Sequence, residues 1–191
     1  IAEEVGVDGT VLLATGRGFA DAVSASAYAA DRGWPVLLVD GDAVPAPTLR
    51  VLQDAGTRRA VPVGGPDAID ESVLDTVRDA GVDVAGRLAG PTRWATSAAV
   101  VDAHLGTSPG TEAIWVATGA DFPDALAAGA AAARAGAVLQ TTPPHTADVD
   151  GSTEDVAGTV TEHAACRGGS LTTAVVVGGP LALSDQVRDE L

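Results

Sequence analysis

A nine-residue motif occurs twice in the chain, each time after a short apolar run. Residues 14–22 have the sequence A-T-G-R-G-F-A-D-A, and residues 117–125 have the sequence A-T-G-A-D-F-P-D-A. The runs before them, residues 11–13 and 114–116, are V-L-L and I-W-V. An apolar run, a glycine turn and a stretch of small residues predict a buried strand that leads into a helix. The shared pattern A-T-G-x-x-F-x-D-A therefore predicts the same strand–turn–helix unit twice.

The duplication extends well beyond this motif. It continues through a second apolar run, a V-G-G-P turn and a final helix, at residues 35–39, 63–66 and 70–80 in the first copy and 137–141, 177–180 and from Ser184 in the second. Between the first glycine and the V-G-G-P turn, the second copy carries 11 more residues than the first. An internal repeat of about a hundred residues indicates duplicated domains rather than a short solenoid.

The alternation of strands and helices predicts an α/β fold with two tandem modules. Each module is expected to be a small parallel sheet flanked by helices, Rossmann-like or flavodoxin-like. We place the modules at residues 1–85 and 86–191. Residues 1–6 resemble the end of a helix, so the N-terminal part of the first module is expected to be missing. The second module carries an insertion near residues 142–169, with one marginal helix at 153–164.

Glycines and capping residues predict where several elements begin and end. One long helix is expected at residues 19–32, ended by Gly33, and its counterpart at 122–135, ended by Gly136. Asp70 is expected to cap the helix at 70–80. The remaining predicted helices cover residues 45–55 and 93–105, and the remaining strands cover residues 59–63, 82–85 and 175–177.

Composition limits the partners that the chain can have. All 11 basic residues are arginine and 26 residues are acidic, for a formal net charge of −15. Such a field opposes nonspecific nucleic-acid binding, which needs clustered cations. No apolar run approaches the roughly 18 residues of a membrane span. Cys166 is the single cysteine, so no internal disulfide forms; His163-x-x-Cys166 is half a zinc site, and neither a metal nor a cofactor is expected.

The ordered motifs resemble one known family. A-T-G-x-x-F-x-D-A, P-V-L-L-V and V-G-G-P are followed by R-x-A-G-x-x-R-W-x-T at residues 87–96, and this set is similar to the cell-wall-binding repeat type 2. The resemblance covers nearly the whole chain in two copies. It implies compact α/β modules that attach exported proteins noncovalently to the cell envelope. Their partners would be an anionic secondary wall polymer and adjacent repeat modules, and their location the extracellular, S-layer-associated cell surface.

Two departures from this pattern bear on binding. The second copy of P-V-L-L-V is A-V-L-Q-T, which is more polar, so a ligand site built on that strand would differ between the modules. The segment at residues 87–96 has no counterpart after Leu191. A binding assembly completed by a further module would leave this chain a weak binder alone.

Arg87, Arg93 and Trp94 are the first candidates for polymer contact. A guanidinium matches the geometry of phosphate or carboxylate, and an anionic polymer needs local cations in so acidic a protein. The alternative for the two arginines is a structural ion pair that joins the modules. Trp94 would stack on a sugar or, alternatively, pack in a core or interface.

The repeated turns supply the other candidates. Thr15 and Gly16, with Thr118 and Gly119, would either cradle a phosphate and line a polymer groove or form tight strand–helix turns, because neither copy has a nucleotide-loop signature. Asp21 and Asp124 would be catalytic or, as we favour, helix-start carboxylates near free N–H groups. No histidine or second acid recurs beside both copies, so we predict no catalytic residue.

Two other functions stay open from the sequence. One is an enzyme acting on a phosphorylated sugar or nucleotide through the Thr-Gly turns and the two aspartates. The other is a surface spacer whose repeats no longer bind a ligand. The favoured hypothesis is a module that binds an anionic wall glycan and performs no chemistry, with several weak contacts adding across repeats.

Overall fold

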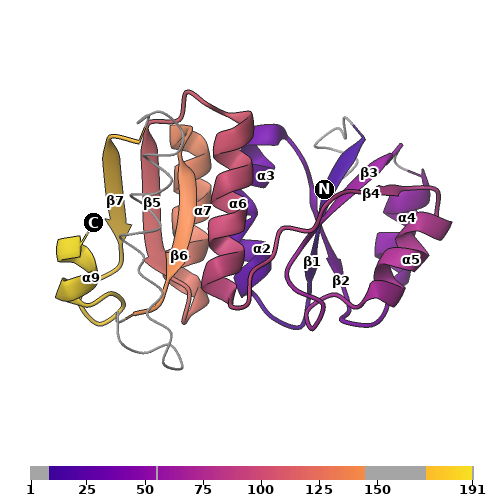
Figure 1. Cartoon of the computed structure of the whole chain (residues 1–191), viewed down its shortest axis with the longest axis horizontal. Coiled ribbons are helices and arrows are strands. Elements are labelled where there is room, and N and C mark those ends of the chain that lie inside the picture. Colours follow the sequence, from indigo (N-terminus) through magenta and orange to yellow (C-terminus); the bar gives the residue numbers. More distant parts are fainter. Residues whose placement is uncertain (1–8, 55, 145–170, 191) are drawn as a thin grey trace.

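Two small parallel sheets lie on either side of a layer of helices (Figure 1). The computed structural model describes residues 9–54, 56–144 and 171–190. Its elements, in chain order, are β1 (Thr10–Thr15), α2 (Ala20–Ser24), α3 (Ser26–Arg32), β2 (Val36–Val39), α4 (Ala46–Asp54), β3 (Arg59–Val63), α5 (Glu71–Asp79), β4 (Asp83–Val84), α6 (Arg93–Thr107), β5 (Ala113–Thr118), α7 (Phe122–Ala135), β6 (Val138–Thr142), β7 (Thr173–Val177) and α9 (Asp185–Glu190).

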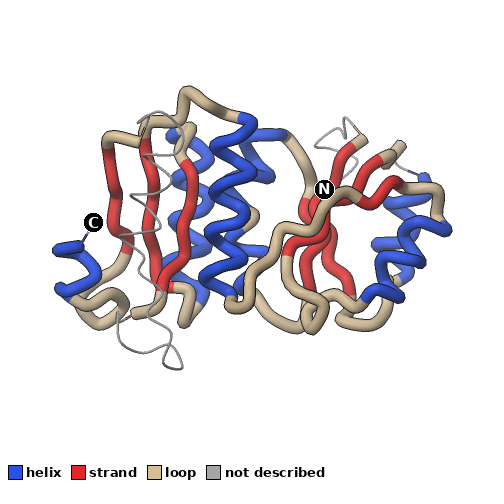
Figure 2. The backbone as a smooth tube through the Cα atoms, viewed as in Figure 1, coloured by secondary structure: helices blue, strands red, loops and turns tan. Residues whose placement is uncertain are grey.

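The first sheet has the strand order β2-β1-β3-β4 and the second has the order β6-β5-β7. All strand pairs are parallel, and β1 and β5 hold corresponding central positions between their partners (Figure 2). The predicted α/β class with two small parallel sheets is therefore confirmed. The predicted helix at residues 153–164 and the residues before Gly9 lie outside the described part of the chain.

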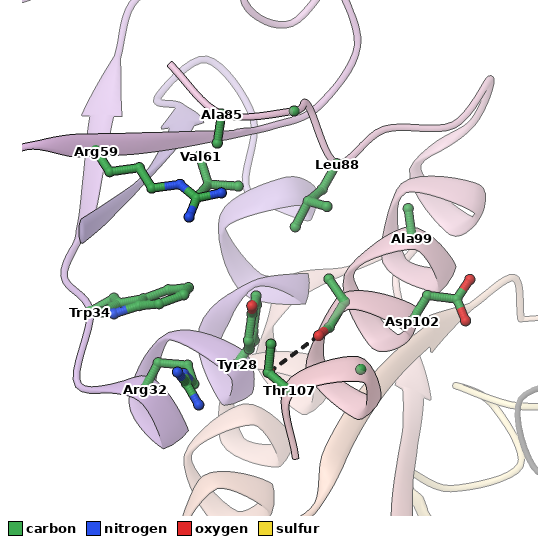
Figure 3. Close-up of a pocket in the computed structure, with 13 residues that line it drawn as sticks. Tyr28, Arg32, Trp34, Arg59, Val61, Ala85, Leu88, Ala99, Asp102 and Thr107 are labelled. Atoms are coloured by element: carbon green, nitrogen blue, oxygen red, sulfur yellow. Dashed lines mark hydrogen bonds between the residues drawn. The ribbon is translucent and has the colours of Figure 1, made fainter. Parts of the chain in front are cut away.

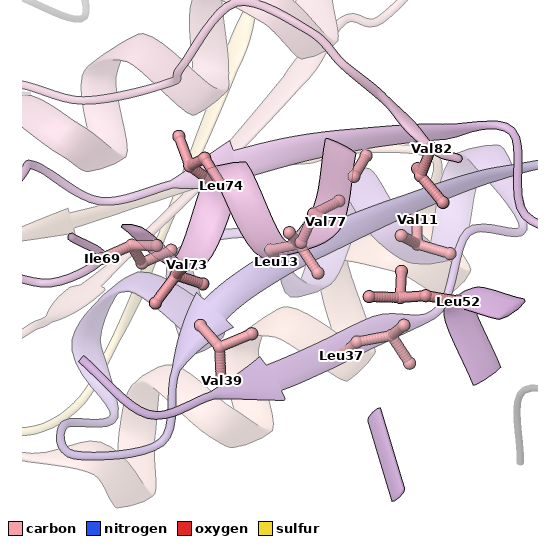
Figure 4. Close-up of a cluster of buried hydrophobic side chains, with 11 residues drawn as sticks. Val11, Leu13, Leu37, Val39, Leu52, Ile69, Val73, Leu74, Val77 and Val82 are labelled. Atoms are coloured by element: carbon pink, nitrogen blue, oxygen red, sulfur yellow. The ribbon is translucent and has the colours of Figure 1, made fainter. Parts of the chain in front are cut away.

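Both faces of the central strands β1 and β3 are buried, which explains their continuous apolar runs. Val11 and Leu13 point to the outer face, where α4 and α5 cover them (Figure 4). Leu12 points to the inner face and packs with Tyr28 and Ala29 of α3. The members of the outer cluster are Val11, Leu13, Leu37, Val39, Leu52, Ala60, Ile69, Val73, Leu74, Val77 and Val82.

Helices from both copies share the layer between the sheets. Figure 1 shows α2, α3, α6 and α7 there, and α2 and α3 of the first copy contact α7 and β6 of the second. Small side chains make this close packing possible: Val23 and Ala27 join Ala125, Ala128 and Ala132 in one buried cluster. A side chain at Gly129 would overlap Ser26 Oγ of α3.

Local predictions hold at the caps and fail at one helix interior. Gly33 and Gly136 end α3 and α7 in the left-handed conformation, both with φ near 64°, and Asp70 accepts a 2.8 Å bond from Ser72 N. The predicted continuous helix at residues 19–32 is wrong, because it is interrupted at Ala25. Ser26 Oγ donates to the Val23 carbonyl at 2.6 Å and so competes with the regular backbone pattern.

The polar residues of β6 have a structural explanation. Gln140, Thr141 and Thr142 are all buried. Thr141 N donates to Ser97 Oγ of α6 at 2.8 Å, and its hydroxyl lies 3.2 Å from Ser24 Oγ of α2. The Thr141 hydroxyl therefore has a partner on the helix that covers this strand, as a buried polar group needs. Gln140 Nε2 donates to the Trp94 and Thr141 carbonyls, while its Oε1 has no partner among the described residues.

Candidate functional site

A hollow of about 380 Å³, which we call the first cleft, opens at the carboxyl ends of β1 and β3. Three turns line it: the one after β1, the V-G-G-P turn after β3, and the segment that enters α6. In open parallel sheets this edge is where ligands bind, because the connecting loops diverge there. The side chains that matter most for its chemistry are Thr15, Asp21, Asp67, Thr92, Arg93 and Thr96.

The Thr-Gly turns are closed by their own hydrogen bonds. The hydroxyls of Thr15 and Thr118 accept from the N–H groups of Arg17 and Ala120, each at 3.2 Å. Gly16 N donates to the Val39 carbonyl at 2.8 Å, and Gly119 N donates to the Thr142 carbonyl at 2.9 Å. These glycine N–H groups are therefore engaged by the neighbouring strand, an arrangement that supports the tight-turn alternative over a phosphate cradle.

Asp21 and Asp124 occupy the first turn of α2 and of α7, as expected. Their carboxylates, however, lie against the V-G-G-P turns of their own copies. A Cβ on Gly64 would lie 2.5 Å from Asp21 Oδ2, and one on Gly178 would lie 2.8 Å from Asp124 Oδ2. Both glycines have positive φ, so the aspartate and the first glycine of V-G-G-P form one repeated contact.

Burial raises the pKa of Asp21 above its ordinary value, and the charge of Arg93 partly opposes this shift. A raised folded-state pKa means that the protonated form favours the fold. The stabilising effect of protonation is complete below the unfolded pKa near 3.8 and is lost as the pH rises through the folded pKa.

We therefore expect Asp21→Asn to raise the thermal midpoint at pH 7, with a gain that shrinks toward pH 3. Thermal unfolding at a series of pH values measures this difference. Asp67→Asn, which removes an exposed carboxylate from the same cleft, serves as the control. A gain for Asp21→Asn that does not depend on pH would contradict the assignment to desolvation.

Arg93 begins α6 and lies where the two copies meet. Its Nη1 donates to the Gly119 carbonyl of the second copy at 3.2 Å. Its guanidinium carbon lies 5.8 Å from the ring centre of Phe19 and 5.6 Å from that of Trp94. The side chain is exposed, and no carboxylate of the described residues forms an ion pair with it. Arg93 therefore presents a positioned cation at the edge of the first cleft.

Arg87 and Trp94 have structural surroundings instead. Arg87 donates to the carbonyls of Gly64, Gly65 and Ile69 at 2.9, 3.2 and 3.0 Å, and its side chain is 19% exposed. These bonds fix the V-G-G-P turn. Trp94 covers the second Thr-Gly turn so closely that a Cβ on Gly119 would overlap its ring. This contact accounts for a glycine at residue 119.

A second cleft of about 450 Å³ lies at the equivalent edge of the second sheet. Thr118 and Asp124 correspond to Thr15 and Asp21 of the first cleft. None of the residues known to line the second cleft is basic: they are Thr118, Ala120, Asp121, Pro123, Asp124, Pro144, Leu181 and Ala182. As far as the described residues line them, the two clefts therefore share a backbone plan and differ in charge.

Of the seven candidate residues, the structure brings Thr15 and Arg93 together in the first cleft and places Thr118 in the second. Gly16, Gly119 and Arg87 lie in the adjoining turns, and Trp94 lies in the first turn of α6. The sequence analysis did not predict the contact between Asp21 and Gly64. The aspartate and the V-G-G-P turn are repeated together in both copies, and this joint repetition could have indicated the contact.

Within the described residues, no three potential metal ligands gather in one place.

The described helices include none with the length and apolar character of a membrane span.

Two parallel α/β repeats with a cleft at the carboxyl edge of each sheet define a tandem binding module, and the family comparison names the class. The chain belongs to the family "Cell wall binding domain 2 (CWB2)", whose model matches residues 1–74 and 87–188. The predicted family is therefore confirmed, and with it an association with the cell wall.

Similar proteins agree with this assignment. The chain is 26% identical over 182 residues to N-acetylmuramoyl-L-alanine amidase LytC of Bacillus subtilis (strain 168), covering 95% of the chain and 34% of that protein. Cwp6 from Clostridium difficile has the same fold, with a TM-score of 0.79 at 21% identity over 99% of the chain and 29% of the neighbour. Cwp8 from the same organism matches with a TM-score of 0.76 at 20% identity, over 100% of the chain and 31% of the neighbour. The chain thus spans about a third of each relative.

Proposed function

We propose that the chain attaches an exported protein noncovalently to the cell envelope by binding an anionic secondary wall polymer, without chemistry of its own. The observation that carries the anionic part of this proposal is Arg93. It is an exposed guanidinium beside a cleft, and it forms no ion pair with the described acidic residues. In a chain of net charge −15, such a cation is the feature suited to a phosphate or carboxylate of a polymer.

The geometry around Arg93 favours a polymer over a small ligand. Its bond to the Gly119 carbonyl holds the guanidinium between the turns of both copies. The first cleft lies beside this side chain and is lined by two turns of the first copy and the segment that enters α6. A chain-like ligand would cross the cleft and meet the cation at its edge. Further contacts in adjoining modules would add to the affinity.

The extracellular location follows from the same proposal, since a wall polymer is met outside the cell. The family is a binding-domain family, and the amidase activity in the name of the relative LytC belongs to that protein, of which the chain covers 34%. The role proposed for the chain is therefore anchoring.

Cosedimentation with purified cell walls of the producing organism tests this function. We expect the chain to pellet with intact walls and to stay in the supernatant after chemical removal of the secondary polymer. Arg93→Ala is expected to weaken binding about tenfold, as for loss of one charge-assisted hydrogen bond. Because this substitution also removes the bond to the Gly119 carbonyl and the charge beside Asp21, the thermal midpoint is measured as well, and binding is compared at a temperature at which both proteins are folded.

Arg50→Ala is the matched control, since it removes an exposed arginine whose side chain bonds to a carbonyl of its own helix. If walls bind the chain equally well with and without the polymer, the secondary wall polymer is not its ligand. Equal binding by the Arg93 and Arg50 variants would remove Arg93 from the site.

A further inference from the structure

A third hollow, the aromatic groove, lies between α3, α6 and the β3–β4 edge of the first sheet (Figure 3). Its volume is about 810 Å³, and it shares no lining residue with the first cleft. Tyr28, Arg32 and Trp34 form one side and Arg59 projects toward them from β3, while Leu88, Asp102 and Thr107 lie across the opening. Two aromatic rings and two cations thus face one space.

The aromatic side of the groove is held rigidly. Tyr28 meets Trp34 edge to face, with ring centres 5.3 Å apart, and its other neighbour is the buried His104 at 5.1 Å. Trp34 Nε1 is buried and has no acceptor among the described residues. A buried donor without an acceptor is costly, so the tryptophan is not explained by its hydrogen bonding. The large flat ring itself is what this position supplies.

The two arginines of the groove lie on opposite sides of the Trp34 ring. The Arg32 guanidinium carbon lies 5.3 Å from the ring centre of Trp34, and Figure 3 shows Arg59 on the other side of that ring. Both residues are exposed. In the part of the chain that the structure describes, neither forms an ion pair with a carboxylate, whereas Arg17, Arg78 and Arg87 do.

We propose that the aromatic groove binds one anionic saccharide unit of the same wall polymer, as a contact separate from the first cleft. The apolar face of a sugar ring packs on the face of Trp34 that is turned toward Arg59, and the Arg59 guanidinium binds its carboxylate or phosphate, while Arg32 lies over the opposite face of the indole. This inference rests on the proposed function. It makes the boundary between the copies a second point of attachment, so the two sites on one chain act together.

The test uses wall cosedimentation of the full chain carrying Arg32→Gln and Arg59→Gln. The matched control carries Arg50→Gln and Arg134→Gln, which changes the net charge equally. Arg50 and Arg134 are exposed and do not line the groove, and Arg134, like Arg32, lies in the last turn of a helix ended by a left-handed glycine. We expect the groove variant to bind about tenfold more weakly than the control.

Two results separate the failure of this inference from the failure of the proposed function. If the groove and control variants bind walls equally well, the groove is not a polymer site, while the cleft and the anchoring role stand. If the unaltered chain does not bind the polymer, both proposals fall. A thermal midpoint within a few degrees of the control shows that the groove variant is folded, and Trp34→Leu in the same assay, expected to weaken binding with both arginines present, tests the ring contact independently.

Discussion

Replacing Gly129 by leucine is expected to lower the free energy of unfolding by about 3 kcal/mol. Gly129 is buried in α7 where that helix crosses α3, and any side chain there would overlap Ser26 Oγ, with Ser26 Cβ 3.2 Å from the added Cβ. The helices would have to separate and open the cluster of small residues between them. This loss exceeds the gain of about 1 kcal/mol from removing a helical glycine. Chemical denaturation measures the change.

Ala130→Leu provides the comparison on the same helix. Ala130 follows Gly129 in α7 but is exposed, so a larger side chain there is expected to change stability by less than about 0.5 kcal/mol. If both variants lose the same amount, α3 and α7 are not in contact in solution. In that case the two copies would behave as separate modules.

Replacing Arg87 by leucine is expected to cost about 3 kcal/mol as well, for an electrostatic reason. The substitution removes the donors to the carbonyls of Gly64, Gly65 and Ile69 and leaves the V-G-G-P turn without its clamp. Arg87→Lys should lose less, because it keeps the charge, but an ammonium cannot reproduce the planar set of bonds. Denaturant unfolding of the two variants tests this order of lost stability.

Arg78→Leu is the control for Arg87, because Arg78 is exposed and its ion pairs within the described residues are with the carboxylates of Glu71 and Asp75. Its removal should leave the unfolding midpoint nearly unchanged. A second measurement separates structure from binding at Arg87. If wall binding by folded Arg87→Leu falls as much as for Arg93→Ala, Arg87 contacts the polymer and is more than a clamp.

The sequence predicted the repeated elements well because their signals are local. Apolar runs mark β1 and β5, and single glycines end α3 and α7. The break at Ala25 was not predicted, because the hydroxyl of Ser26 gives no sign in the sequence of which carbonyl it will take.

Contacts between the copies were beyond prediction for a different reason. The repeat shows which elements correspond, but not that α2 and α3 of one copy pack on α7 and β6 of the other. The residues that join them are short: Ser24 meets Thr141, and Ser26 lies against Gly129. Such residues carry little periodic hydrophobic signal. Arg93 was predicted as a ligand contact from its chemistry, whereas its bond to Gly119 depends on this arrangement of the copies.

The contact between Trp94 and Gly119 has a consequence for the substitutions that the two copies of the motif can tolerate. Gly16 and Gly119 occupy the same position of the repeated A-T-G motif, yet their surroundings constrain them differently. A Cβ at Gly16 would lie 3.6 Å from the Val39 carbonyl oxygen and 3.7 Å from Leu38 Cβ, which are ordinary contacts, whereas one at Gly119 would overlap the indole. Replacing Gly119 by alanine is therefore incompatible with Trp94 in its present place, whereas the contacts around Gly16 leave room for alanine.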